Sequence, residues 1–218
     1  MKNTKRVFGV YTAWDYAREI EDLNKMSKKG WQLVKGGLYS NKYKKNDNVQ
    51  YRYQLDFNKS IDDMGRYIET FREQGWEYVN STINGWHYFR KLYDPSLPAE
   101  EYEIYCDNQS LKEMQNNWKK AAIPMTVAIG LAFLMELFAS IRDFNLTSIS
   151  LCVTLFIEFV MLLRGVIIMR KPQRTTEEAF AGTDNNIDKK AFGGHRITIM
   201  IIILFVGFAV TIVSLFLS

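Results

Sequence analysis

The sequence is poor in the residues that form covalent or metal-bound centres. It has 2 cysteines, Cys106 and Cys152, and 2 histidines, His87 and His195, among 218 residues. Two cysteines, one of them inside a hydrophobic segment, cannot build the disulfide framework of a small secreted domain. Neither histidine has a second ligand at the spacing of a zinc site. We therefore expect reduced thiols, no metal site and no cofactor.

Catalytic motifs are missing as well. The sequence contains no GxxxxGK[ST] phosphate loop, no GxGxxG, no GxSxG and no HExxH. We therefore expect that the protein is not an enzyme and assign no catalytic residue. An enzyme acting on lipid or nucleotide at a membrane surface would need clustered acids or histidines, such as Asp15, Glu19 and His87. We rank this enzyme hypothesis third, after the two functional hypotheses given at the end of this subsection.

Long basic runs are also absent from the N-terminal half. The net charge is +4 and the pI is near 8.9, but lysines and arginines there alternate with acids. Nucleic-acid binding usually shows as a basic stripe or cluster, so we expect no nucleic-acid partner.

Long apolar runs are present, and all of them lie in the C-terminal half. Residues 121–141, 146–169 and 197–217 are each long enough to cross a membrane, since about 20 apolar residues span the hydrocarbon core. We predict three transmembrane helices in a bacterial plasma membrane, with the lipid bilayer as first partner. The basic residues of the membrane half gather in segment 170–196, with only Arg142 between the first two spans. The positive-inside rule then predicts a cytoplasmic N-terminus, a cytoplasmic loop at 170–196 and a C-terminus outside.

Three ionisable residues interrupt these runs: Glu136 in the first and Glu158 and Arg164 in the second. A charge near the bilayer centre costs about 2.5–3.5 kcal/mol on insertion scales. We expect these side chains to make polar contacts within the membrane. Association of helices is the simpler interpretation, and contact with a partner's spans is the alternative.

Residues 1–108 are predicted to form an α+β head that contains an internal repeat. Gly30-Trp31-Gln32-Leu33-Val34 aligns with Gly75-Trp76-Glu77-Tyr78-Val79 at an offset of 45 residues, which also places Tyr43 on Tyr88 and Lys45 on Arg90. Each unit, at about 5–47 and 49–93, reads strand, helix, strand, strand, with the helix stopped by Gly30 or Gly75. Two units predict a mostly antiparallel sheet of about six strands with both helices on one face.

The chain between the repeats and the first span contains two further signals. Residues 102–107 have the composition of an extra edge strand. Ser110 with Glu113 forms a capping box, which predicts the start of a juxtamembrane helix over 109–120 that runs into the first span.

Aromatic residues in the head exceed what a small core needs. Alternate strand positions point away from the helices, so a second aromatic face is expected. Packing under the helices or at the join of the units explains such rings simply. The alternative is a cleft for an apolar or cationic ligand or a peptide, bordered by acids such as Glu19 and Asp56. The candidate ligand-binding residues are Tyr11, Trp14, Asp15, Trp31, Tyr53, Trp76 and Trp86.

Several short motifs resemble a known bacterial family. They are Gly30-Trp31-Gln32-Leu33, Tyr51-Arg52-Tyr53, Gly75-Trp76-Glu77-Tyr78-Val79, Trp86-His87-Tyr88-Phe89-Arg90-Lys91 and Glu103-Ile104-Tyr105-Cys106-Asp107. They resemble an uncharacterised membrane family of Gram-positive bacteria, a domain-of-unknown-function family often encoded beside PadR-type transcriptional regulators. The resemblance covers roughly residues 5–120 and implies a regulatory or stress-linked setting. In element order the paired units are also similar to drug-sensing effector-binding domains, whose paired units form a cleft for amphipathic ligands.

Two functional hypotheses follow. The leading one is a membrane-anchored cytoplasmic sensor or interaction module that binds an amphipathic ligand or a protein partner, with self-association as a homo-oligomer. The second is an accessory subunit of a transport or resistance system, in which Glu136 and Glu158 contact the spans of a membrane-protein partner.

Overall fold

The computed structural model describes residues 3–105, 108–142 and 145–170, and this part of the chain forms two compact units. The first unit ends at Asn117 and the second begins at Trp118. The predicted third span, 197–217, and nearly all of the predicted loop at 170–196 lie outside the described residues.

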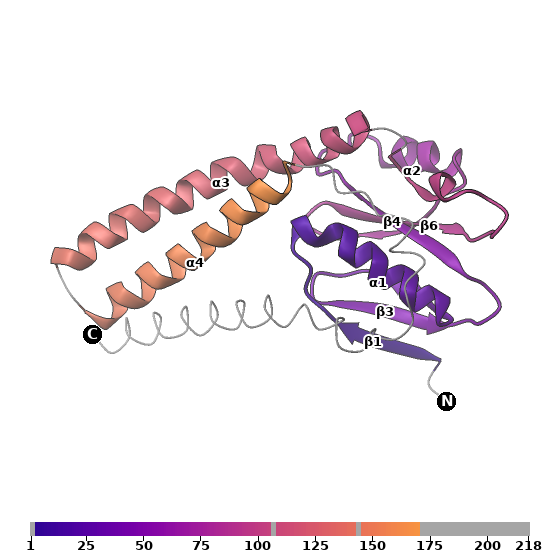
Figure 1. The fold of residues 1–218 in the computed structure, drawn as a ribbon, viewed down its shortest axis with the longest axis horizontal. Helices are drawn as coiled ribbons and strands as arrows, with labels where there is room; N and C mark the ends of the chain where they lie inside the picture. Colours follow the sequence, from indigo (N-terminus) through magenta and orange to yellow (C-terminus); the bar gives the residue numbers. More distant parts are fainter. Residues whose placement is uncertain (1–2, 106–107, 143–144, 171–218) are drawn as a thin grey trace. The chain divides into compact units, whose positions relative to one another are not determined.

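The first unit contains two antiparallel sheets of three strands (Figure 1). The first sheet has the strand order β1-β3-β2, and the second has the order β4-β6-β5. The prediction of one sheet of about six strands is therefore wrong. The strands are β1 (Thr4–Phe8), β2 (Trp31–Lys35), β3 (Ser40–Lys45), β4 (Tyr51–Phe57), β5 (Glu77–Ser81) and β6 (Trp86–Leu92). The helices are η1 (Ala13–Asp15), α1 (Tyr16–Lys28), α2 (Met64–Arg72) and η2 (Ala99–Tyr102).

Helix α1 lies between the two sheets, and α2 covers the far side of the second sheet. Figure 1 shows α2, the strands β4 and β6, α1, and the strands β3 and β1 as successive layers. The Ser27 hydroxyl of α1 donates to Gln32 of the first sheet over 2.7 Å and accepts the main-chain N–H of Tyr51 in the second sheet, also over 2.7 Å. The prediction that both helices cover one face is therefore wrong.

The second sheet is buried on both faces, which explains this layering. Tyr88 and Phe89 are consecutive residues of β6, so their side chains point to opposite faces, yet they are 3% and 0% exposed. The ring of Phe89 lies 4.2 Å from that of Phe71 on α2, while the Tyr88 hydroxyl bonds to α1. Strands with such continuous apolar runs need a layer on each side. The predicted second aromatic face exists, and α1 covers it.

The two sheets have matching irregularities. The register shifts between Leu33 and Lys35 in β2 and between Tyr78 and Asn80 in β5. Leu33 lies opposite Tyr43, but Tyr78 lies opposite Phe89. Phe89 therefore occupies the place equivalent to Tyr43, and the predicted alignment of Tyr43 with Tyr88 is wrong by one residue.

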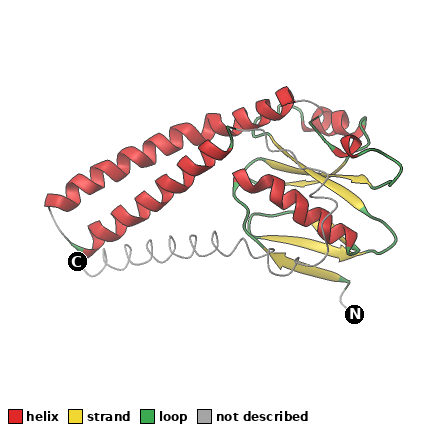
Figure 2. Ribbon diagram, viewed as in Figure 1, coloured by secondary structure: helices red, strands yellow, loops and turns green. Residues whose placement is uncertain are grey.

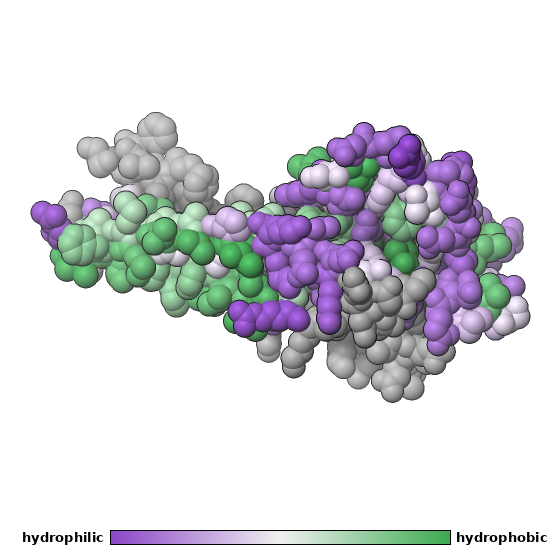
Figure 3. Space-filling view, turned by 90° about the horizontal axis from the view of Figure 1, so that it is seen from above, coloured by the Kyte–Doolittle hydropathy of each residue, from purple (hydrophilic) through white to green (hydrophobic). Residues whose placement is uncertain are grey.

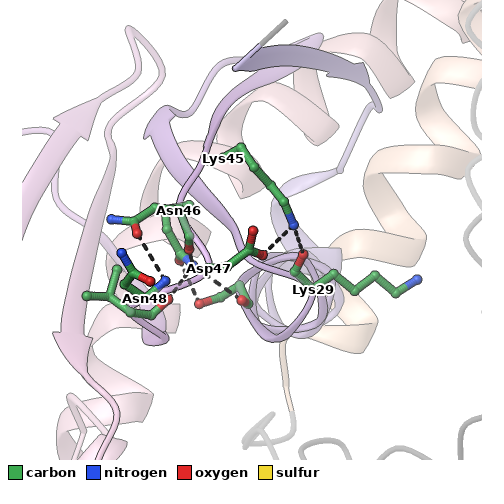
Figure 4. A network of polar contacts seen from close by, with 8 residues as sticks. Lys29, Lys45, Asn46, Asp47 and Asn48 are labelled. Carbon is green, nitrogen blue, oxygen red and sulfur yellow. Dashed lines mark hydrogen bonds and ion pairs between the residues drawn. The ribbon is translucent and has the colours of Figure 1, made fainter. Parts of the chain in front are cut away.

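The glycines predicted to follow the helices are confirmed, with φ of +74° at Gly30 and +82° at Gly75. At Gly30 the surroundings also exclude a side chain, because an added Cβ would lie 1.9 Å from Oδ1 of Asp47. Figure 4 shows the polar contacts around this turn. The Lys45 ammonium donates to the carbonyl of Lys29 over 3.0 Å and pairs with Asp47, and the Asn48 N–H donates to the Asn46 side chain.

The predicted edge strand at 102–107 is wrong over its described residues. Tyr102 ends η2, and its carbonyl accepts a hydrogen bond from the Gln54 side chain over 2.8 Å instead of joining a strand ladder. Ile104 packs in the core against Trp76 and Phe89. This segment is therefore anchored to the second sheet by side chains.

Two long helices follow, α3 (Asn108–Arg142) and α4 (Leu146–Ile168) (Figure 2). Helix α3 begins two residues before Ser110, so the predicted cap at Ser110 is wrong. Its first turns belong to the first unit, where Leu111 and Gln115 are buried. In the second unit, α3 and α4 are long and apolar enough to cross a membrane. Their visible side chains are mostly hydrophobic in Figure 3.

Candidate functional site

The candidate site is built around an acid in the middle layer of the head. Tyr16, Ile20 and Leu23 form the buried stripe of α1 at the 3–4 residue spacing of a helix face. Glu19 lies on the same stripe and is 6% exposed. A carboxylate in that position must be satisfied by hydrogen bonds or change its protonation state.

Glu19 receives one hydrogen bond from each sheet. The Tyr88 hydroxyl of the second sheet donates to Oε1 over 2.8 Å, and the Asn41 amide of the first sheet donates to the same oxygen over 3.3 Å. In the described part of the chain no lysine or arginine forms an ion pair with this carboxylate. Glu19 therefore joins three layers without a neutralising cation.

A second acid and further phenol rings complete the group. Asp22 lies three residues after Glu19 on α1 and accepts a hydrogen bond from the Tyr11 hydroxyl over 2.8 Å. Tyr43 of the first sheet is 3% exposed, and burial together with the nearby charges of Glu19 and Asp22 raises the pKa of its hydroxyl. We call the group the Glu19 site. Its members are Tyr11, Glu19, Asp22, Asn41, Tyr43 and Tyr88.

The ionisation of the site follows from burial. Desolvation raises the pKa of Glu19 to about 7, although the hydrogen bonds from Tyr88 and Asn41 act in the opposite direction. Burial and the charge of Glu19 raise the pKa of Tyr88 far above its usual value. Burial and Asp22 do the same for Tyr11. The phenols therefore remain donors at neutral pH, while Glu19 titrates there.

The two sheets meet beside this site through side-chain bonds. Asn80 of β5 accepts the N–H of Gly36 over 2.8 Å and donates to the Gly36 carbonyl over 2.9 Å. The Tyr88 ring lies on Gly36, where an added Cβ would be 2.5 Å from the ring carbon Cζ. The Tyr88 ring, and with it the Tyr88 hydroxyl, can take this position only because residue 36 is glycine.

A second buried acid lies on the other side of the second sheet. Asp56 is 8% exposed and accepts hydrogen bonds from the hydroxyls of Tyr67 and Tyr105. His87 lies opposite Asp56 in the ladder, and its Nε2 is 2.9 Å from the Asn58 carbonyl. Each acid of the head's core is thus bonded by tyrosine.

The candidate ligand-binding residues are distributed over several layers. Of the seven, only Tyr11 belongs to the Glu19 site, and Asp15 accepts a hydrogen bond from Thr12 before α1. Trp76 packs with Phe89 on the α2 side of the second sheet. The remaining buried rings are those of Trp14, Tyr53 and Trp86. A ligand role for these residues stays a prediction.

Two of these rings have specific neighbours. Trp86 stacks on Tyr16 of α1 with ring centres 5.5 Å apart. Trp31 is half-buried at the end of the first sheet, with the Lys5 ammonium 4.3 Å and the Lys45 ammonium 5.5 Å from its ring centre. Cations already occupy the face of Trp31, which makes it a poor receptor for another cation.

The three ionisable residues of the predicted spans lie in the second unit. Glu136 and Glu158 are half-buried and Arg164 is exposed. None of the three forms an ion pair with another described residue. A hollow of about 290 Å³ between α3 and α4 is lined by apolar side chains, among them Leu131 and Phe159.

Sequence reasoning named Glu19 but missed its partners. Asn41, Tyr43 and Tyr88 are 22, 24 and 69 residues further along the chain, so no local spacing connects them with Glu19. One signal was available, because an acid on the apolar stripe of a helix requires a buried donor. The strand register that places Tyr88 next to Glu19 could be seen only in the structure.

The family of the chain follows from a comparison with protein-family models. The model described as a protein of unknown function, DUF2812, matches residues 15–127, which include α1, both sheets except β1, and the start of α3. The chain belongs to this family. No curated protein and no solved structure matches it. Membership of DUF2812 assigns no ligand and no catalytic residue to the Glu19 site.

The Glu19 site offers acceptor oxygens, phenol donors and aromatic faces. Within residues 3–105, 108–142 and 145–170 no group of three or more His, Cys, Asp and Glu side chains could hold a metal ion. The chemistry that this arrangement permits is a change in the protonation state of Glu19 and the pairing of its carboxylate with a cation, whereas Asp22 already lies 3.8 Å from the Lys25 ammonium.

Proposed function

We propose that this DUF2812 protein is a membrane-anchored cytoplasmic sensor module whose head binds an amphipathic organic cation at the Glu19 site. One observation carries the proposal: Glu19 is buried between two sheets beside three tyrosine rings, and no lysine or arginine in the described part of the chain forms an ion pair with it. An organic cation would neutralise the carboxylate and place its apolar groups against the rings.

The anchoring part of the proposal includes three spans in a bacterial plasma membrane. Helices α3 and α4 support two of them by length and composition. The basic residues after α4 support a cytoplasmic head and a C-terminus outside. The resemblance to a family encoded beside PadR-type regulators supports a regulatory setting.

The proposal also treats the head as an internal duplication. The shared strand order, the register shifts in β2 and β5 and the left-handed Gly30 and Gly75 support it. The Glu19 site lies where the two repeats of the head meet, since Asn41 belongs to the first repeat and Tyr88 to the second. A ligand there would act on both halves at once.

The test is binding of tetraphenylphosphonium to the full-length protein in neutral phosphatidylcholine nanodiscs, measured by calorimetry. We expect saturable binding at pH 8. At pH 5.5 Glu19 is mostly protonated, so the apparent affinity falls by at least about tenfold, since only the ionised fraction binds. Glu19→Gln abolishes the binding at both pH values.

The matched control is Glu21→Gln, which removes an acid from the same helix at a side chain that is 33% exposed. This variant keeps the affinity of the unaltered protein. Neutral triphenylphosphine oxide should not bind. Equal affinity of the unaltered protein and Glu19→Gln, or no saturable binding at all, rejects the cation site.

A second candidate function is an accessory subunit of a transport or resistance system. The observation that favours it is the pair of half-buried acids Glu136 and Glu158, which have no ion-pair partner among the described residues. Purification in mild detergent distinguishes the two candidates. A stoichiometric transporter partner that is lost in Glu158→Gln favours the subunit, and a protein that purifies alone favours the sensor.

A further inference from the structure

The outer face of the first sheet carries a row of exposed cations. Arg6 of β1 and Lys35 of β2 both lie directly opposite Lys42 of β3. Residues directly opposite each other in antiparallel strands share a face, so the three cations form a row across the sheet. Lys44 lies two residues further along β3 on the same face. All four are exposed.

These cations have no counter-charge in the described part of the chain. None of Arg6, Lys35, Lys42 and Lys44 forms an ion pair there. The strands β1, β2 and β3 contain no acid at all. Like charges directly opposite each other destabilise a sheet. An external anionic surface would remove that repulsion.

An exposed aromatic side chain accompanies the cations. Phe8 lies two residues after Arg6, on the same face, and its side chain is 79% exposed. Tyr39, next to the Ser40 that lies opposite Phe8, is 61% exposed. Cations that flank exposed aromatic rings are typical of surfaces that lie in the headgroup region of a bilayer.

We propose that this face, made of Arg6, Phe8, Lys35, Lys42 and Lys44, docks on anionic lipid headgroups. The inference rests on the membrane anchoring proposed above, and it is independent of the cation site at Glu19. Two helices that can cross a bilayer belong to the same chain, so membrane anchoring would tether the head to a leaflet that can carry anionic lipids. Each cation adds about fivefold to the partition onto such a leaflet.

The test reports the distance of this face from lipid in the full chain. Thr4, opposite Lys44 in the ladder, is exposed and takes a bimane label as Thr4→Cys in a Cys106→Ala, Cys152→Ala background. The protein is placed in nanodiscs that contain headgroup-nitroxide phosphatidylcholine, with or without phosphatidylglycerol. We expect strong quenching in the anionic discs, little in the neutral discs, and loss of the difference at high salt.

Charge reversal identifies the residues responsible. Lys42→Glu with Lys44→Glu should reduce the quenching in anionic discs to the level of neutral discs. The control, Lys59→Glu with Arg66→Glu, changes the net charge equally at exposed positions near α2 that have no ion pair in the described chain. This control keeps full quenching.

Three outcomes overturn the inference. They are equal quenching in neutral and anionic discs, an equal loss in both double variants, and a label that responds to duplex DNA or polyglutamate but not to lipid. Tetraphenylphosphonium binding is measured in neutral discs and through Glu19→Gln, so failure of that site leaves the quenching result intact. Recovery of the protein in the soluble fraction would instead reject the anchoring itself.

Discussion

The two sheets of the head have the same strand order but use their charged residues differently. In the second sheet, Arg90 pairs with Glu77 over 2.8 Å and Lys91 pairs with Glu101 over 3.3 Å. In the first sheet, Lys42 and Lys44 face outward without any partner in the described chain. These cations of the second sheet are paired within the molecule, whereas in the first sheet Lys45 pairs with Asp47 but Lys42 and Lys44 have no ion pair in the described chain.

The difference follows from the order of the layers. The second sheet lies between α1 and α2, so both of its faces are occupied by side chains of the protein. Among the described residues, the first sheet is covered by α1 on one face, and the cations of its other face are exposed. An antiparallel sheet covered on one side turns polar residues to its surroundings. The exposed Phe8 departs from that rule, which is why a lipid surface suits this face better than water alone.

The largest expected effect tests whether the second sheet is packed on both of its faces. Phe89→Ala removes a ring that is fully buried between the second sheet and α2. It should lower the free energy of unfolding by about 3–5 kcal/mol through lost burial and the cavity left behind. Urea unfolding of the full-length protein in nanodiscs, followed by tryptophan fluorescence, measures the change.

The contrasting substitution in the first sheet is Lys44→Ala, at an exposed position on the outer face of β3. Exposed substitutions usually stay within about 0.5 kcal/mol. A loss at Lys44 comparable to that at Phe89 would show that the outer face of the first sheet is packed, and the comparison would fail.

The next effect concerns the acid that joins both sheets. Glu19 has a pKa of about 7 in the folded head and an ordinary value of 4.5 when unfolded. Between these values the folded state binds more protons than the unfolded state, so stability falls as the pH rises. The loss is complete above pH 7 and amounts to about 3 kcal/mol at 1.36 kcal/mol per pKa unit.

Glu19→Gln should therefore stabilise the head at pH 8, by up to about 3 kcal/mol, and change little at pH 4.5. The glutamine oxygen still accepts the hydrogen bonds of Tyr88 and Asn41. Urea titrations at several pH values measure the slope. A steep slope that persists in Glu19→Gln, or one that disappears equally in Glu21→Gln, would assign the pH dependence to another group.

A smaller effect tests how the two sheets are joined. Gly36→Ala places a methyl group within 2.5 to 2.8 Å of three carbons of the Tyr88 ring. The ring must move away, which costs about 1–3 kcal/mol by overpacking and loosens the bond to Glu19. Gly9→Ala is the control, because its Cβ would meet only Tyr11, at 3.4 Å or more. If both variants unfold at the same urea concentration as the unaltered protein, the junction is not strained.

Local sequence signals predicted most of the helices and strands of this head, but they did not predict how these elements pack together. The glycines after the helices and the strand, helix, strand, strand order depend on short-range backbone chemistry, and they are found as predicted. The strand count gave no information on how six strands divide into sheets. The buried neighbours Tyr88 and Phe89 carried the missing signal, because consecutive aromatic residues in a strand require cover on both faces.

The candidate site was less predictable for a physical reason. Tryptophans at conspicuous positions, such as Trp76 and Trp86, proved to be core residues. The polar group lies instead at Glu19, whose donors come from two different sheets. Such a site depends on long-range register, and one residue of error in the alignment of β3 with β6 assigns Tyr88 to the wrong face.

The smallest expected effect is a change in stability that has opposite signs when a charge is removed from the first or from the second sheet. Lys42→Thr removes the central charge between Arg6 and Lys35 and introduces a good strand former. Relief of two like-charge pairs should stabilise the head by about 0.5 kcal/mol at low salt. Glu77→Gln, which breaks the exposed pair with Arg90, should destabilise it by a similar or smaller amount. The electrostatic part of both changes should vanish in high salt, because the charges are exposed and screened, while any gain from the strand propensity of threonine remains. Urea unfolding in neutral nanodiscs at low and high ionic strength measures both, and a destabilising Lys42→Thr would mean that Lys42 has a counter-charge after all.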